Sequence, residues 1–380
     1  MTKEQKDNLF VLIKSLSKSE KRQFKLYVGR LGVNEDSKFL QLFNVLEKLP
    51  AYDERVILNK GIVKKQQLSN LKAHLYKQIL ISLRLNPSHQ NVRIQIREQL
   101  DFATILYHKG LYKQSLKILD KAKALAIANE EKNVAYEIIE LEKVIESQYI
   151  TRSLSNRADE LTIQARDISK QNVLASKLSN LSLQLYGLFL KTGYVKNDEE
   201  FNRVTTYFHN RLPKYDINDL GFREKLWLYK SYLWYSFLIQ DFRSCYRYSK
   251  KWVDLFHENP SMIQLNPVFF LRGNQYLLEA LFFIKHHDKF KNALESLESV
   301  TSQDSFPKDD NVESLTFLYL YNNKFNLHFM EGSFHEGLPL VNEVLDGIKK
   351  HRSRLDEHHI RHRGTSSPMP DSRRRRWHRR

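Results

Sequence analysis

The sequence predicts an all-α protein in which a small helical N-terminal domain precedes an array of stacked antiparallel helical hairpins. Hydrophobic residues make up 41% and aromatic residues 12% of the 380 residues, which is ample for packed cores. The chain contains only 12 Gly and 9 Pro, too few for the turns that many short strands require. Apolar residues instead recur at helical spacing along most of the chain. Because 380 residues exceed what one ordinary core supports, we expect either several domains or an elongated array.

Residues 1–90 form the predicted N-terminal domain, which we expect to contain about five helices. A capping box of Ser17 and Glu20 marks the start of one of them. The longest should run from about Lys64 to Leu85, because leucines and isoleucines recur there along one face. The domain is basic, with 17 Lys and Arg against 8 Asp and Glu.

Residues 91–350 form the predicted repeat array, in which pairs of helical segments are joined by short polar turns. Asn266 and Pro267 illustrate a helix start, since a capping residue followed by a first-turn proline favours initiation. Charges are balanced here, with 32 Lys and Arg against 33 Asp and Glu in residues 91–348. The six expected hairpins have the approximate limits 93–128, 133–170, 173–211, 222–257, 268–302 and 312–350.

The turns of several hairpins share a pattern of glycine, an aromatic residue two positions later and a small residue three positions after that. The runs Gly110-Leu111-Tyr112-Lys113-Gln114-Ser115 and Gly332-Ser333-Phe334-His335-Glu336-Gly337 follow it. Phe242 with Cys245, and Phe290 with Ala293, keep the aromatic and the small residue. Residues 93–350 therefore resemble the tetratricopeptide repeats, although these anchors are spaced more widely than the roughly 34-residue period of that family. The resemblance implies a right-handed array of stacked hairpins, an α-solenoid.

The resemblance also implies a binding surface, because the first helix of each hairpin lines the concave groove in that family. A groove that mixes polar and aromatic side chains suits the capture of a peptide. The groove residues that the family register implies are Arg97, Thr104, Tyr107, Trp227, Lys230, Trp234, Gln275, Phe282, Lys285, Tyr319, Asn322 and Asn326.

The hairpin at 222–257 is unusually aromatic, with Trp227, Trp234 and Trp252 among several tyrosines and phenylalanines. Its first helix carries aromatic residues all round, and two readings are open. Helices that are apolar all round are usually buried on two sides. Alternatively, some of these rings are exposed anchors for a partner peptide or helix.

Sequence motifs for catalysis and for cofactor or metal binding are absent. No Gly-x-Gly-x-x-Gly run, Walker-type loop or Gly-x-Ser-x-Gly elbow occurs. The His-Glu pairs at His257 and His335 lack the second histidine of a zinc-protease helix, and the single Cys245 cannot form a cysteine-based zinc site. The sequence therefore predicts a protein that is not an enzyme and has no cofactor or metal.

These observations favour a non-enzymatic scaffold or adaptor that binds a protein or peptide partner. The chain has no long apolar run and no signal-like N-terminus, so we expect a cytoplasmic protein with no membrane partner. An alternative is a nucleic-acid-binding regulator, in which the basic helices of residues 1–90 contact phosphates and the repeats act as a sensing domain. A solvated, lysine-rich helix face explains the same charge.

Residues 351–380 form an expected disordered, arginine-rich tail. Residues 1–348 contain 34 Lys and 15 Arg, whereas residues 349–380 contain 2 Lys and 10 Arg. Such a change in basic residue usage is typical of a segment that is not part of the natural sequence. The other reading is an arginine-rich arm for nucleic acid, built on residues 373–380.

Overall fold

The computed structural model describes residues 7–30, 37–86, 91–148 and 156–358. Secondary structure in these residues is helical and includes no strand, which confirms the all-α prediction. The chain divides into two compact units, Met1–Ile105 and Leu106–Arg380. The division lies within α6, after the boundary near residue 90 that the sequence suggested. Residues 359–380, most of the expected tail, lie outside the described residues.

The first unit is a small helical domain with its own core. Leu9, Phe24, Phe43, Leu75 and Ile79 are buried together in that core. Ser17 and Glu20 form the predicted capping box, in which each backbone N–H donates to the other side chain. The helices of the first unit are α1 (Asn8–Ser15), α2 (Lys18–Arg30), α3 (Lys38–Lys48), α4 (Glu54–Asn59) and α5 (Lys65–Arg84). Helix α6 (Val92–His108) begins in the first unit and ends in the second.

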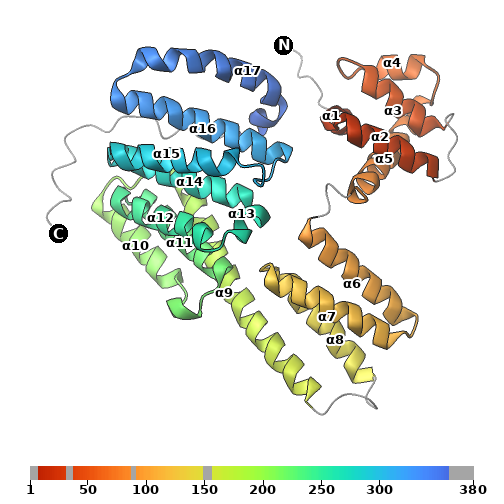
Figure 1. The fold of residues 1–380 in the computed structure, drawn as a ribbon, viewed down its shortest axis with the longest axis horizontal. Helices are drawn as coiled ribbons and strands as arrows, with labels where there is room; N and C mark the ends of the chain where they lie inside the picture. Colours follow the sequence, from red (N-terminus) through yellow and green to blue (C-terminus); the bar gives the residue numbers. More distant parts are fainter. Residues whose placement is uncertain (1–6, 31–36, 87–90, 149–155, 359–380) are drawn as a thin grey trace. The chain divides into compact units, whose positions relative to one another are not determined.

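The second unit is a succession of helices in which neighbours along the chain pack together (Figure 1). Many of these helices have the same length of 17 residues. The helices are α7 (Tyr112–Ala128), α8 (Lys132–Gln148), α9 (Arg157–Thr192), α10 (Asp198–Arg211), α11 (Phe222–Leu238), α12 (Phe242–Glu258), α13 (Ser261–Leu265), α14 (Pro267–Phe283), α15 (His287–Ser302), α16 (Asp310–Glu331) and α17 (Phe334–His358). The last of these helices, α17, continues past residue 350, the predicted end of the final hairpin.

The same turn recurs between paired helices and carries a residue in the left-handed region. Gly110, Glu130, Gln240, Lys285 and Gly332 occupy this position, with φ between 56° and 73°. The following backbone N–H returns to a carbonyl in the last turn of the preceding helix, which satisfies groups that the helix end leaves free. Only two of the five are glycine, so the glycine-based pattern in the sequence marks only part of the turns.

Helix α9 is a single helix of 36 residues, which corrects the predicted break between the hairpins 133–170 and 173–211. The polar stretch around Lys170 contains no glycine or proline, and nothing there interrupts the backbone hydrogen bonds. Buried residues such as Ile168, Ala175 and Leu178 continue one face through this point. The helix ends at Gly193, which has a φ of 68°.

Aromatic side chains dominate the core shared by α11, α12 and α14. Trp252, Phe256 and Phe270 are fully or almost fully buried, and the Trp252 ring lies 5.8 Å from that of Tyr276. Trp234 is also part of this core. Much of the aromatic character of the hairpin at 222–257 is therefore used in packing, while other rings, such as Trp227, remain half-exposed.

Substitution of Gly273 by alanine should destabilise the protein by about 1–3 kcal/mol, because the core around Trp252 is tightly packed. A Cβ atom on residue 273 would lie 2.9 Å from the indole ring, and that ring is fully buried. Gly187→Ala in α9 is the matched control, since nothing lies within 4 Å of its added Cβ. The control should be stabilised by about 0.5–1 kcal/mol through helix propensity. Urea unfolding followed by circular dichroism tests both, and equal effects would contradict the packing argument.

Candidate partner-binding face

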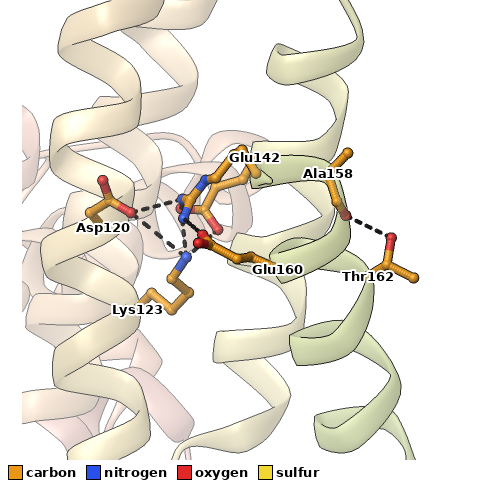
Figure 2. A network of polar contacts seen from close by, with 7 residues as sticks. Asp120, Lys123, Glu142, Ala158, Glu160 and Thr162 are labelled. Carbon is orange, nitrogen blue, oxygen red and sulfur yellow. Dashed lines mark hydrogen bonds and ion pairs between the residues drawn. The ribbon is translucent and has the colours of Figure 1, made fainter. Parts of the chain in front are cut away.

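A network of charged side chains around the fully buried Glu142 joins α7, α8 and the start of α9 (Figure 2). Lys123 Nζ lies 2.8 and 2.6 Å from the two carboxylate oxygens of Glu142. Arg157 donates to Asp120 at 3.1 Å and to Glu142 at 3.2 Å. Burial raises the pKa of Glu142, and the hydrogen bond from Lys123 and the charge of Arg157 oppose that shift. Because these charges neutralise each other, the network joins three helices rather than offering a site.

A different arrangement occurs where α11 faces α14. The ammonium group of Lys230 lies 4.7 Å from the centre of the Trp227 ring and 5.5 Å from that of Phe269. The two rings are themselves 5.7 Å apart and nearly perpendicular. Aromatic faces attract a cation, so they hold this ammonium group in a half-buried position. Burial and the positive charge of Arg272 together lower the pKa of Lys230 to about 8.

Arg272 extends the positive charge towards α16, where it interacts with the hydroxyl group of Tyr319. Burial raises the pKa of that tyrosine, and the guanidinium group opposes the shift. Within the described residues, neither Lys230 nor Arg272 forms an ion pair with a carboxylate. Two neighbouring cations without a counter-charge repel each other and destabilise the fold. An anionic group of a ligand would relieve this repulsion, so the two cations form a candidate anion-binding site.

Amide side chains connect α14 with α16 beside these cations. The Asn323 amide donates to Gln275 Oε1 at 2.6 Å and to the Tyr319 carbonyl at 2.8 Å. Asn326 donates in turn to Asn323 at 3.4 Å. We call the surface formed by Trp227, Lys230, Phe269, Arg272, Gln275, Tyr276, Glu279, Tyr319 and Asn326 the α11–α14–α16 face.

Glu279 is the acidic member of this face and lies seven residues after Arg272 on α14. It is half-buried, and burial raises the pKa of its carboxyl group to about 7. Its charge contributes to the raised pKa values of Tyr194, Tyr276 and Tyr319, for which burial is the main cause, so these tyrosines lie in its neighbourhood. Within the described part of the chain it forms no hydrogen bond or ion pair.

The predicted groove residues fall into separate groups. Trp227, Lys230, Gln275, Tyr319 and Asn326 lie together on the α11–α14–α16 face. Phe282 is half-buried near the end of α14, with its ring 6.1 Å from that of Phe329, and Asn322 is exposed on α16.

The three groove residues predicted on the first hairpin belong to α6, which the division between the two units crosses. Arg97 and Thr104 lie in the first unit, where Arg97 is exposed and the Thr104 hydroxyl donates to the carbonyl of Leu100 at 2.8 Å. Tyr107 lies in the second unit, and its hydroxyl donates to Gln148 at 3.1 Å.

Two of the predicted groove positions need correction. Trp234 is only 6% exposed, because Tyr186 and Phe189 of α9 and Tyr276 of α14 cover its ring. Its indole is therefore part of the core rather than a surface anchor. Lys285 is exposed, but it occupies the left-handed position of the turn after α14 rather than a helical position.

Sequence reasoning missed Phe269, Arg272, Tyr276 and Glu279. The available signal was the pair of opposite charges seven residues apart on one predicted helix, which places both on the same side of it.

Several basic side chains of the N-terminal domain are paired with acids. Lys21 and Lys25 both reach the carboxylate of Glu47, at 3.8 and 3.0 Å. Lys72 forms an ion pair with Asp7. These ion pairs neutralise part of the positive charge within the domain.

Comparison with known proteins gives no relative for this chain. No family model matches it, and neither the curated proteins nor the solved structures include a significant match. The described residues contain no group of three or more metal-binding side chains. Among the same residues, no helix is both long and apolar enough to cross a membrane.

Proposed function

We propose that this protein is a non-enzymatic scaffold or adaptor that binds a partner protein through the α11–α14–α16 face. The observation that carries the proposal is the pair of cations Lys230 and Arg272, which no carboxylate of the described residues neutralises. Desolvating a lysine without a counter-charge costs stability. A role in binding an anion therefore best explains why Lys230 is half-buried at this position.

The surroundings of the two cations suggest what the partner presents. Trp227 and Phe269 offer half-exposed rings beside the Lys230 ammonium group. An acidic side chain next to an apolar one would pair with the cations and cover these rings. The amides of Gln275 and Asn326 could bond the backbone of an extended segment. We therefore expect a peptide segment with an acidic residue beside an apolar residue.

The arrangement of the second unit supports this reading. Paired helices of equal length and a recurring turn are typical of tandem helical hairpins, and such arrays commonly bind peptides along the first helices of their pairs. A right-handed, tetratricopeptide-like solenoid is part of the proposal.

Selection of a random peptide library on the immobilised full-length protein tests the function. Peptides that combine Asp or Glu with an apolar or aromatic neighbour should be enriched. The double variant Lys230→Met, Arg272→Gln should bind the enriched peptides at least about tenfold more weakly in fluorescence anisotropy, because charge-assisted hydrogen bonds contribute about 1.5–3 kcal/mol.

Lys251→Met provides the matched control. Lys251 also lies over two aromatic rings, those of Tyr229 and Tyr248, each 5.9 Å away, but it is exposed on α12. This variant should bind the peptides as the wild type does. Peptides without acidic residues, or equal affinity of the double variant and the wild type, would show that the two cations do not form the binding site.

A further inference from the structure

Glu279 presents a charge opposite to that of Lys230 and Arg272 on the same helix face. Positions 272, 276 and 279 follow one side of α14, because residues four and seven apart lie nearly above one another on a helix. Tyr276 thus separates the guanidinium group from the carboxyl group. A single ligand can therefore contact both the cations Lys230 and Arg272 and the carboxyl group of Glu279.

The carboxyl group has neighbours that suit a cation. The Tyr276 ring packs 5.6 Å from that of Trp234 and 6.2 Å from that of Phe237, which makes the surroundings strongly aromatic. Tyr194 lies close enough to be influenced by the charge of Glu279. Its hydroxyl group is buried and has no hydrogen-bond partner among the described residues.

A purely structural role explains Glu279 poorly. An acidic side chain in an apolar helix interface destabilises the fold unless a donor or a cation pairs with it. No such partner occurs within the described residues, although the side chain remains partly accessible from the surface. A single carboxylate without further acidic or histidine ligands is also a poor metal site.

We propose that Glu279, among the rings of Tyr194, Tyr276 and Tyr319, binds a cationic side chain, a lysine ammonium or an arginine guanidinium group, of the same partner segment whose acidic residue meets Lys230 and Arg272. The inference rests on the proposed function and makes it more specific. A carboxylate beside aromatic rings attracts a cation through both its charge and the ring faces. The partner is therefore a segment of mixed charge rather than a simply acidic one.

The distance along α14 gives the spacing of the two charges in the partner. Seven helical residues at about 1.5 Å each separate the two parts of the face by roughly 10 Å. An extended peptide advances by about 3.3 Å per residue, so the basic residue should lie about three residues from the acidic one.

A peptide library with one fixed glutamate and randomised flanks, selected on the full-length protein, tests this inference. The wild type should enrich Lys or Arg about three positions from the glutamate. Glu279→Gln keeps the size and shape of the side chain and should lose this preference while still selecting the glutamate. For one selected peptide, anisotropy should show about tenfold weaker binding to Glu279→Gln than to the wild type. When norleucine replaces the basic residue, the two proteins should bind within about twofold of each other.

The outcomes separate this inference from the proposed function. Binding that depends on Lys230 but shows no preference for a basic residue, or the same preference in Glu279→Gln, overturns the cation site and leaves the proposed function standing. Binding of no peptide by the wild type overturns both. Circular dichroism spectra and melting curves of each variant show that it is folded.

Discussion

Replacing Glu142 by alanine should destabilise the protein by about 3–5 kcal/mol, because the change leaves a lysine and an arginine in the interior without their shared carboxylate. Glu142 is fully buried, and both of its oxygens lie within hydrogen-bond distance of Lys123 (Figure 2). Arg157 would retain Asp120 and Glu160, but Lys123 would keep only an exposed aspartate 3.7 Å away. The free energy of unfolding, measured in urea, provides the test.

Two further variants show whether burial or charge alone causes the effect. Glu160→Gln removes another carboxylate bonded to Arg157, but Glu160 is 57% exposed and its loss should cost less than about 1 kcal/mol. The double variant Lys123→Met, Glu142→Leu removes both charges and should recover most of the stability, since apolar residues often replace a buried pair without loss. Equal effects of Glu142→Ala and Glu160→Gln would mean that the network is solvated.

The helices of the second unit were predictable because their signals are local. Pro267 follows a capping residue and starts α14, and the apolar spacing of 222–257 gives α11 and α12 with nearly the right limits. The continuity of α9 was not predictable in this way. A polar stretch around Lys170 resembles a turn, and only the packing of both halves of the helix against neighbouring helices shows that no turn is needed there.

The candidate site was predictable only in part, for a related reason. A helical register placed Trp227, Lys230 and Tyr319 on the face, but it could not show that α9 covers Trp234. Arg272 and Glu279 look in the sequence like ordinary surface charges. Their significance depends on tertiary packing, which half-buries Glu279 and brings the exposed Arg272 close to Lys230, and on the absence of an ion pair at either residue within the described part of the chain.

Replacing Glu279 by glutamine should stabilise the protein, and the gain should depend on pH. Burial raises the pKa of this carboxyl group in the native state from 4.5 to about 7. Between these values the native state binds more protons than the unfolded state, so the contribution of Glu279 to stability falls as the pH rises. The glutamine variant has no ionisable group at this position, so its stability does not fall in this way as the pH rises. Its advantage should be close to zero below about pH 4 and reach at most about 3 kcal/mol at about pH 8.

The pKa values of the buried groups near Glu279 lie above this pH range. Burial is the main cause that raises the pKa values of Tyr194, Cys245, Tyr276 and Tyr319, so these groups stay neutral up to about pH 8. Lys230, on the same face, has a pKa lowered to about 8, so it begins to lose its proton only at the upper end of this range, and it does so in the wild type and the variant alike. The difference between wild type and variant therefore reports on one carboxyl group.

Urea unfolding of the full chain at several pH values, with Glu295→Gln as control, measures this effect. Glu295 is exposed on α15 and forms no ion pair within the described residues, so its substitution should change stability by less than about 0.5 kcal/mol at every pH. A gain for Glu279→Gln that is the same at low and high pH would show that ionisation of Glu279 does not strain the fold. A gain that grows with pH would mean that the fold keeps a charge which weakens it, as expected where that charge is reserved for a cationic partner.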